Sequence, residues 1–149
     1  IMMESLQGFF MSVTTLFNNE ENSWEEKIEI FVSSYIDVLI KHPDIPLFVL
    51  SELRANPNAL ISKMNVKGVM LKSHFMKQFQ EQIKKGNIAP THPLHFLMNL
   101  IGMAVFPFIG SPILKNIGDL KEKDFNELME QRKKLIPQWI KMMYKIPKK

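Results

Sequence analysis

The sequence of 149 residues contains no cysteine, and only two of its nineteen basic residues, Arg54 and Arg132, are arginine. Without cysteine, disulfide bridges and thiolate metal sites are excluded, and the composition is compatible with a reducing cytoplasm, where we expect the protein to reside. Proteins that read DNA bases favour arginine, because its planar fork can bond two acceptors at once. We therefore do not expect this chain to read a base sequence directly.

The sequence also lacks a secretory signal and an internal boundary. Its first turn carries Glu4 and no basic residue, so no signal peptide is indicated. Ile1 falls in what reads as the middle of a helix, so we expect a part of a longer protein. The prolines and glycines are scattered and form no linker, so residues 1–149 are predicted to be one domain.

Motifs for catalysis are missing. The sequence holds no phosphate loop, no glycine-rich dinucleotide motif, no nucleophile elbow and no HExxH zinc motif. Neighbouring carboxylates, as at Glu25 and Glu26, lie on charged helix faces where no dry pocket can tune their pKa values. His92 and His95 are three residues apart but have no third ligand, so a helix cap and a surface or interface histidine are favoured over a metal pair. We expect no enzyme, no metal and no cofactor.

Alternating strand patterns are absent as well, and apolar residues recur at helical spacing throughout. The chain is therefore predicted to be all-α, a bundle of about six helices. The predicted helices cover residues 1–17, 23–41 behind a capping box, a short stretch after Asp44, 57–85 ended by Gly86, 92–106, and 121–144.

Charge is missing from one long stretch, since Pro93 to Leu114 contains no Asp, Glu, Lys or Arg. Such a segment must be buried in a core, against a second subunit, or in a membrane. Pro107 is expected to end or kink its helix, and the residues around Pro112 are expected to be irregular, so we do not expect a membrane span. The remaining explanation is that this segment is buried partly within the domain and partly against a partner subunit.

The helix within this stretch has more apolar faces than a domain of this size is expected to cover. One face combines His95, Asn99, Gly102 and Phe106, a mixture suited to a close helix crossing, and Arg132 interrupts the apolar stripe of the last helix. A four-helix seam between these two helices and their symmetry mates accommodates both features. The predicted homodimer interface comprises His95, Gly102, Phe106, Leu128, Arg132, Leu135 and Trp139.

Aromatic and methionine side chains fall on helices that are expected to face one another. They can be simple core, or they can line an apolar cavity in which a few polar groups orient a small lipophilic or amphipathic ligand. The predicted ligand-binding residues are Phe31, Tyr35, Leu39, Phe48, Met70, His74, Phe75, Asn99 and Met103.

Four segments, in order, carry a likeness to a known family: HPDIPLFVLSELRANP (42–57), a long helix ending KKGNI, HFLMNLIGMAVFPFIGSPIL (95–114), and a last helix beginning DFNELMEQRKK. Together they cover nearly the whole chain and resemble the C-terminal ligand-binding and dimerisation domain of TetR/AcrR-type bacterial transcriptional regulators. His42–Glu52 and the Val105–Phe108 break carry most of the likeness.

This resemblance implies a repressor that is a homodimer through its last two long helices and binds a small-molecule effector between the earlier ones. The helix-turn-helix domain that reads DNA in this family is absent from the sequence, so DNA contact is implied only through that missing domain. Residues 1–17 correspond to the helix that links the two domains. The alternative is a helical protein-interaction module with a fully packed interior and no small ligand.

Overall fold

A computed structural model describes residues 2–64, 68 and 71–146 of the chain. Within these ranges the protein forms eight α-helices and no strand, which confirms the all-α prediction but exceeds the expected number of about six. The helices are α1 (Met2–Asn18), α2 (Trp24–Lys41), α3 (Ile45–Ala55), α4 (Pro57–Met64), α6 (His74–Lys84), α7 (Pro93–Ile109), α8 (Ser111–Gly118) and α9 (Glu122–Tyr144).

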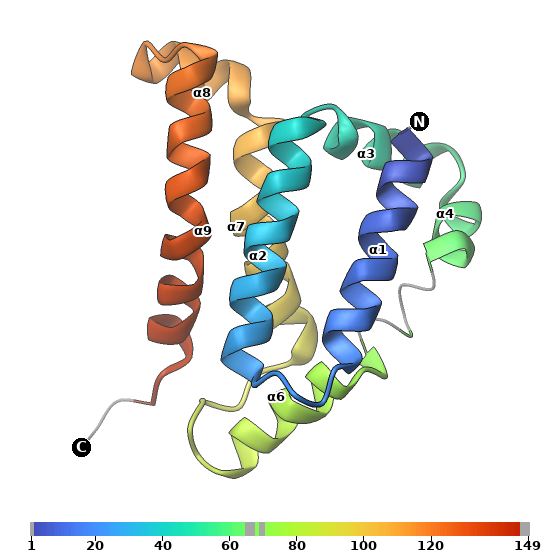
Figure 1. The fold of residues 1–149 in the computed structure, drawn as a ribbon, viewed down its shortest axis with the longest axis vertical. Coiled ribbons are helices and arrows are strands. Elements are labelled where there is room, and N and C mark those ends of the chain that lie inside the picture. Colours follow the sequence, from blue (N-terminus) through green and yellow to red (C-terminus); the bar gives the residue numbers. More distant parts are fainter. Residues whose placement is uncertain (1, 65–67, 69–70, 147–149) are drawn as a thin grey trace.

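Helix α2 forms the centre of the molecule. It packs along α9 on one side and α1 on the other, with α7 behind it and α6 across its N-terminal end (Figure 1). Val32, Ile36 and Leu39 recur at helical spacing along α2 and are fully buried. An apolar stripe of this kind is stable when neighbouring helices cover it.

An aromatic cluster fastens the end of the bundle where α6 lies. Phe17 at the end of α1 stacks on Phe75 at 4.4 Å between ring centroids, and Phe96 of α7 lies 4.9 Å from Phe79 and 5.6 Å from Trp24. Each ring buries a large apolar surface, and close aromatic pairs add about 0.5–1.5 kcal/mol beyond that burial. The cluster joins four helices into one core.

A buried lysine strengthens the same end. Lys27 is fully buried on α2 and its Nζ donates to Gln78 Oε1 of α6 at 2.7 Å. Gln78 in turn donates through Nε2 to the carbonyl of Asn22 at 3.0 Å. Burial lowers the pKa of Lys27, and the charge of Glu20 partly opposes that effect. The turn before α2 is thereby tied to α6.

Capping residues explain several helix boundaries. Ser23 Oγ accepts from the Glu26 N–H at 3.1 Å, and His92 Nδ1 accepts from the Leu94 N–H at 3.1 Å, as the sequence indicates.

The prediction of one helix over 57–85 is wrong, because α6 begins at His74 after a bend over residues 72–73. The Ser73 hydroxyl accepts from the Met76 N–H at 3.3 Å, and this cap competes with continuation of the helix.

Pro107 lies inside α7, which continues to Ile109, so the prediction that the proline could end the helix is wrong. Proline has no N–H, and therefore it cannot donate to the carbonyl of Met103, four residues earlier. Arg132 of α9 supplies the missing donor, with Nη2 at 2.7 Å from the Met103 oxygen. A guanidinium thus replaces a backbone bond and fastens α9 to α7.

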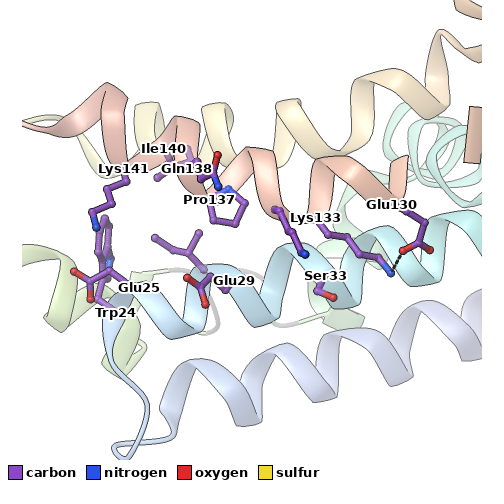
Figure 2. Close-up of a pocket in the computed structure, with 12 residues that line it drawn as sticks. Trp24, Glu25, Glu29, Ser33, Glu130, Lys133, Pro137, Gln138, Ile140 and Lys141 are labelled. Atoms are coloured by element: carbon purple, nitrogen blue, oxygen red, sulfur yellow. Dashed lines mark ion pairs between the residues drawn. The ribbon is translucent and has the colours of Figure 1, made fainter. Parts of the chain in front are cut away.

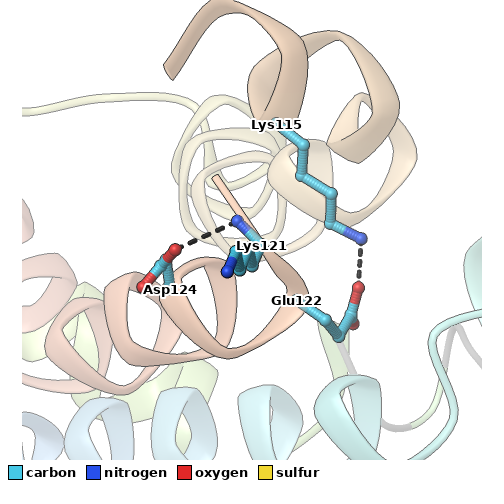
Figure 3. Close-up of polar contacts among 4 residues, drawn as sticks. All are labelled: Lys115, Lys121, Glu122 and Asp124. Atoms are coloured by element: carbon cyan, nitrogen blue, oxygen red, sulfur yellow. Dashed lines mark hydrogen bonds and ion pairs between the residues drawn. The ribbon is translucent and has the colours of Figure 1, made fainter. Parts of the chain in front are cut away.

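The segment after α7 was expected to be irregular, but it forms α8, with Pro112 in the first turn where its missing N–H is tolerated. At the following corner, Asp119 adopts a left-handed conformation with φ of 51°. Lys115 pairs with Glu122, and Asp124 Oδ2 accepts from the Lys121 N–H at 3.0 Å (Figure 3). The ion pair joins α8 to the start of α9, and the hydrogen bond caps the first turn of α9.

No single helix within the described ranges is both long and apolar enough to cross a membrane. Helices α7 and α8 reach the required length and hydropathy only as a pair, and they are bent by 69° relative to each other.

Candidate ligand cavity and subunit interface

A cavity of about 270 Å³ lies between α1, α2, α3 and α7. Its walls are contributed by Leu6, Phe9, Phe10 and Val13 of α1; Phe31, Tyr35, Val38 and Leu39 of α2; Ile45, Pro46, Val49 and Leu50 of α3; and Ile101, Val105 and Ile109 of α7. The two lining residues with the greatest exposure are Leu50 of α3 at 42% and Ile109 of α7 at 38%.

Among the described residues of this lining, Tyr35 alone has a polar side chain. Its ring packs against Phe9 at 5.0 Å and Phe31 at 5.6 Å between centroids. Burial raises the pKa of Tyr35 to about 12, so the hydroxyl stays neutral at physiological pH. No hydrogen bond to this hydroxyl is formed by residues 2–64, 68 or 71–146. This uncharged hydroxyl, which can donate and accept, therefore lies in an otherwise apolar wall without a partner among the described residues.

The helical stripe of α2 identified three of the lining residues, since Phe31, Tyr35 and Leu39 all border the cavity. The wall from α1 was missed as a site, although its wide apolar stripe is plain in the sequence. That stripe holds more apolar residues than one packing contact needs, and this excess was the available signal.

Other predicted ligand residues lie elsewhere. Phe48 is partly buried against the core but does not border the cavity, and Phe75 is fully buried in the aromatic cluster. His74 begins α6, and its backbone N–H donates to Asn18 Oδ1 at 3.2 Å. Met70 lies outside the described residues.

Asn99 and Met103 lie on the opposite side of α7 from the cavity. Asn99 Nδ2 donates to the Tyr144 hydroxyl at 2.7 Å, which adds a second polar tie between α7 and α9. Both Asn99 and Met103 border a shallow surface hollow between these helices, together with Gly102 and Arg132. Their place is therefore the outer surface, beside the residues predicted for the dimer.

Three faces of α7 are now distinguishable. Phe96, Leu100 and Ala104 enter the core; Ile101, Val105 and Ile109 border the cavity; and His95, Asn99 and Phe106 are exposed, with Gly102 half-buried beside them. One helix thus forms a wall of the cavity with one face and presents the predicted interface with another.

The outward surfaces of α7 and α9 are unusually apolar. The exposed fraction is 59% for Met98, 54% for Phe106, 42% for Leu128, 37% for Trp139 and 50% for Met143. Contiguous exposed apolar surface of this kind marks an interaction site more often than plain solvent contact. All seven predicted interface residues belong to these two helices.

Arg132 and Gly102 have distinct roles on this surface. The Arg132 guanidinium lies 5.1 Å from the Trp139 ring centroid, and burial lowers the pKa of Arg132. Its Nε is buried without a hydrogen-bond partner among the described residues. A Cβ at Gly102 meets nothing within 4 Å, so the space above this residue is open in the isolated chain.

A second hollow of about 630 Å³ runs between α2 and α9 (Figure 2). Its lining mixes acidic and basic side chains, and Lys133 Nζ pairs with Glu130 at 2.6 Å and also with Asp37. Burial by itself lowers the pKa of Lys133, but the two hydrogen-bonded carboxylates outweigh it and raise the pKa. Because these charges already neutralise one another, this groove is a weaker candidate for ligand binding than the apolar cavity.

Comparison with known proteins gives no assignment. No protein-family model matches the chain, and no curated protein is detectably similar to it.

Proposed function

We propose that this chain is the effector-binding and dimerisation domain of a TetR-type bacterial transcriptional repressor. In this proposal a small lipophilic or amphipathic molecule occupies the cavity, and a helix-turn-helix domain outside this sequence contacts DNA. The observation that carries the proposal is that one cavity has walls from both α1 and α7. Under the resemblance, α1 is the helix that leads to the DNA-reading domain, and α7 belongs to the dimer interface.

This arrangement supplies a physical route from ligand to DNA. A ligand that favours one position of α1 over another shifts the population between two arrangements of the DNA-reading heads. The two heads of a dimer bind half-sites at a fixed spacing, so a changed spacing weakens binding. For a tenfold loss of DNA affinity, the ligand must bind one arrangement about 1.4 kcal/mol more tightly than the other.

The exposed surfaces of α7 and α9 support dimerisation. Phe106 and Met98 on α7, with Leu128 and Trp139 on α9, form apolar stripes at helical spacing. In a two-fold dimer each residue of these stripes is present in two copies, and both copies are buried in the interface. Burying a whole Phe side chain contributes about 1.5–3 kcal/mol, and Phe106 is 54% exposed, so its two copies together contribute about 1.5–3 kcal/mol.

The test for dimerisation uses Gly102→Leu, with Gly8→Leu in α1 as its matched control. Both glycines lie in helices, and a Cβ at either position meets nothing within 4 Å, so neither change is expected to disturb the monomer. Leucine is a better helix former than glycine by about 0.5–1 kcal/mol, so the fold is not weakened. Only the side chain at 102 obstructs a close helix crossing.

Sedimentation equilibrium at micromolar concentration gives the readout. We expect a dimer for the wild type and for Gly8→Leu, and a shift to monomer for Gly102→Leu, with unchanged helical content by circular dichroism. Phe106→Glu should also give monomer, because it places an unpaired charge in the interface. A wild-type monomer, or a Gly102→Leu protein that dimerises as tightly as the wild type, contradicts the proposed interface.

The second candidate is a helical protein-interaction module without a small ligand. It is favoured by the exposed leucines of α3, namely Leu47 at 57%, Leu50 at 42% and Leu53 at 38%. The cavity volume of about 270 Å³ is also just below the usual range for ligand pockets, about 300–1,000 Å³. Ligand binding inside the cavity separates the two functions, because the module predicts none.

A further inference from the structure

The residues that line the cavity indicate the chemical class of its ligand. Of the fifteen described residues that border it, fourteen are apolar and the remaining one, Tyr35, carries an uncharged hydroxyl. We propose that the cavity binds a neutral lipophilic molecule of roughly ten non-hydrogen atoms whose single polar group hydrogen-bonds to the Tyr35 hydroxyl. This inference rests on the proposed function, since it takes the cavity to be the effector site.

The volume sets the size of the ligand. The cavity has a volume of about 270 Å³, close to the lower end of the usual range for ligand pockets, about 300–1,000 Å³. A ligand packed at the density of a protein interior fills this space with roughly ten non-hydrogen atoms. Aliphatic alcohols, esters and ketones of medium chain length and simple phenols have this size.

The wall excludes a buried charge. Among the described residues, no Asp, Glu, Lys, Arg or His borders the cavity, so neither an ammonium nor a carboxylate group finds an opposite charge on these walls. An isolated buried ion is strongly disfavoured. The rings of Phe9, Phe31 and Tyr35 could attract a cation, but such contacts contribute too little to replace its lost hydration. A charged headgroup would have to remain in solvent outside the cavity.

The Tyr35 hydroxyl can form a directional hydrogen bond with a ligand in the cavity. Its hydroxyl has no hydrogen-bond partner among the described residues, and its ring is held between Phe9 and Phe31. A phenol can donate one bond and accept others, so it pairs equally with an alcohol, an ether or a carbonyl oxygen. The hydroxyl therefore selects ligands that carry one oxygen rather than ligands that carry none.

The experiment measures binding of three homologous series to the chain by calorimetry: 1-alkanols, 1-alkylamines and alkanoates, each with four to ten carbons. We expect alkanol affinity to rise about fourfold per added methylene, and to level off when the chain fills the cavity. Amines and alkanoates of equal length should bind at least tenfold more weakly. Val105→Phe and, independently, Val49→Phe each place a phenyl ring in the cavity and should weaken alkanol binding at least tenfold.

Tyrosine variants test the anchoring group. Tyr35→Phe should weaken alkanol binding about two- to tenfold, the worth of one hydrogen bond, and leave binding of a simple alkylbenzene unchanged. The other tyrosine of the chain provides the control, because Tyr144 bonds to Asn99 away from the cavity. Tyr144→Phe should leave both affinities unchanged. Equal losses for alcohol and hydrocarbon in Tyr35→Phe would overturn the anchoring role.

The outcomes separate this inference from the proposed function, provided that sedimentation of the same samples reports the oligomeric state. Amines or alkanoates that bind as tightly as alkanols, and are blocked by Val105→Phe, overturn the neutral class but retain an effector cavity. Absence of binding by all three series to a dimeric chain overturns the ligand class and favours the interaction module. Absence of binding together with a monomeric chain overturns both.

Discussion

Replacing Arg132 with methionine should destabilise the protein by an amount that depends on the residue at position 107. In the wild type, Arg132 Nη2 donates to the Met103 carbonyl at 2.7 Å, and Pro107 cannot do so. In a Pro107→Ala background, the new alanine N–H can donate to that carbonyl within the helix. Loss of the guanidinium then leaves no backbone acceptor without a partner.

The destabilisation caused by losing Arg132 should therefore differ between the two backgrounds. This difference is the coupling free energy between positions 132 and 107, and the structure gives its size. A hydrogen bond from a charged donor contributes about 1.5–3 kcal/mol, and an unpaired buried carbonyl costs about 1–3 kcal/mol. Other consequences of removing Arg132 are shared by both backgrounds: the loss of its contact with Trp139, and the relief of a partly buried cation whose Nε has no partner. These effects cancel in a double-mutant cycle, so we expect a coupling free energy of about 1–2 kcal/mol.

Urea denaturation of the wild type, both single variants and the double variant measures the coupling. On the thermal scale the same energy corresponds to about 2–8 °C for a protein of this size. All four proteins are compared at one concentration, and again at a tenfold higher one, because dimer formation adds a concentration-dependent term. The contact lies within one subunit, so the coupling should be the same at both concentrations.

The matched control is Arg54→Met, which removes the other arginine of the chain from an exposed position on α3. Its effect should add to that of Pro107→Ala within about 0.5 kcal/mol. Suppose instead that the free-energy changes of Arg132→Met and Pro107→Ala add within the same margin of about 0.5 kcal/mol. That result would show that Arg132 does not replace the missing backbone donor, and it would refute the structural reason for an arginine at this position.

Two further predictions concern stability. The pKa of Tyr35 is about 12 in the folded state, and its ordinary value is 10.0. Between these two pH values the unfolded state loses the hydroxyl proton while the folded state retains it. The free energy of unfolding therefore falls as the pH rises through this window. Relative to Tyr35→Phe, the wild type should lose about 2–3 kcal/mol over this window in denaturation experiments, and parallel pH profiles would refute the assignment. Ser73→Ala removes the buried cap at 3.3 Å from the Met76 N–H and should cost about 1–2 kcal/mol. The exposed Ser34→Ala should cost less than about 0.5 kcal/mol, and equal costs would show that the Ser73 cap is unimportant.

Local patterns predicted most helices because their signals are local. The capping serine at position 23, the histidine cap at position 92 and the left-handed glycine at 86 are all found in the structure. The break before α6 was missed, since Ser73 interrupts an apolar stripe that is otherwise helical on both sides. A capping serine and an exposed helical serine look alike in sequence, and packing of the following helix decides between them.

The candidate site was predicted only in part, for a related reason. Phe31, Tyr35 and Leu39 share one stripe on α2, and that stripe borders the cavity. Phe75 has the same kind of signal but belongs to the aromatic core, and Asn99 belongs to the outer surface. Periodicity states that a residue has a buried face, but it does not state which neighbouring helix covers that face.

By itself the sequence determined an all-α chain, its capping residues and a charge-free helix with more apolar faces than one core requires, because these follow from spacing along a single helix. Only the tertiary structure decided which face of α7 enters the core, which borders the cavity and which is exposed, because those depend on the helices packed around it. It also revealed that Arg132 bonds the carbonyl left free by Pro107. That contact joins residues 29 positions apart, and no local pattern specifies it.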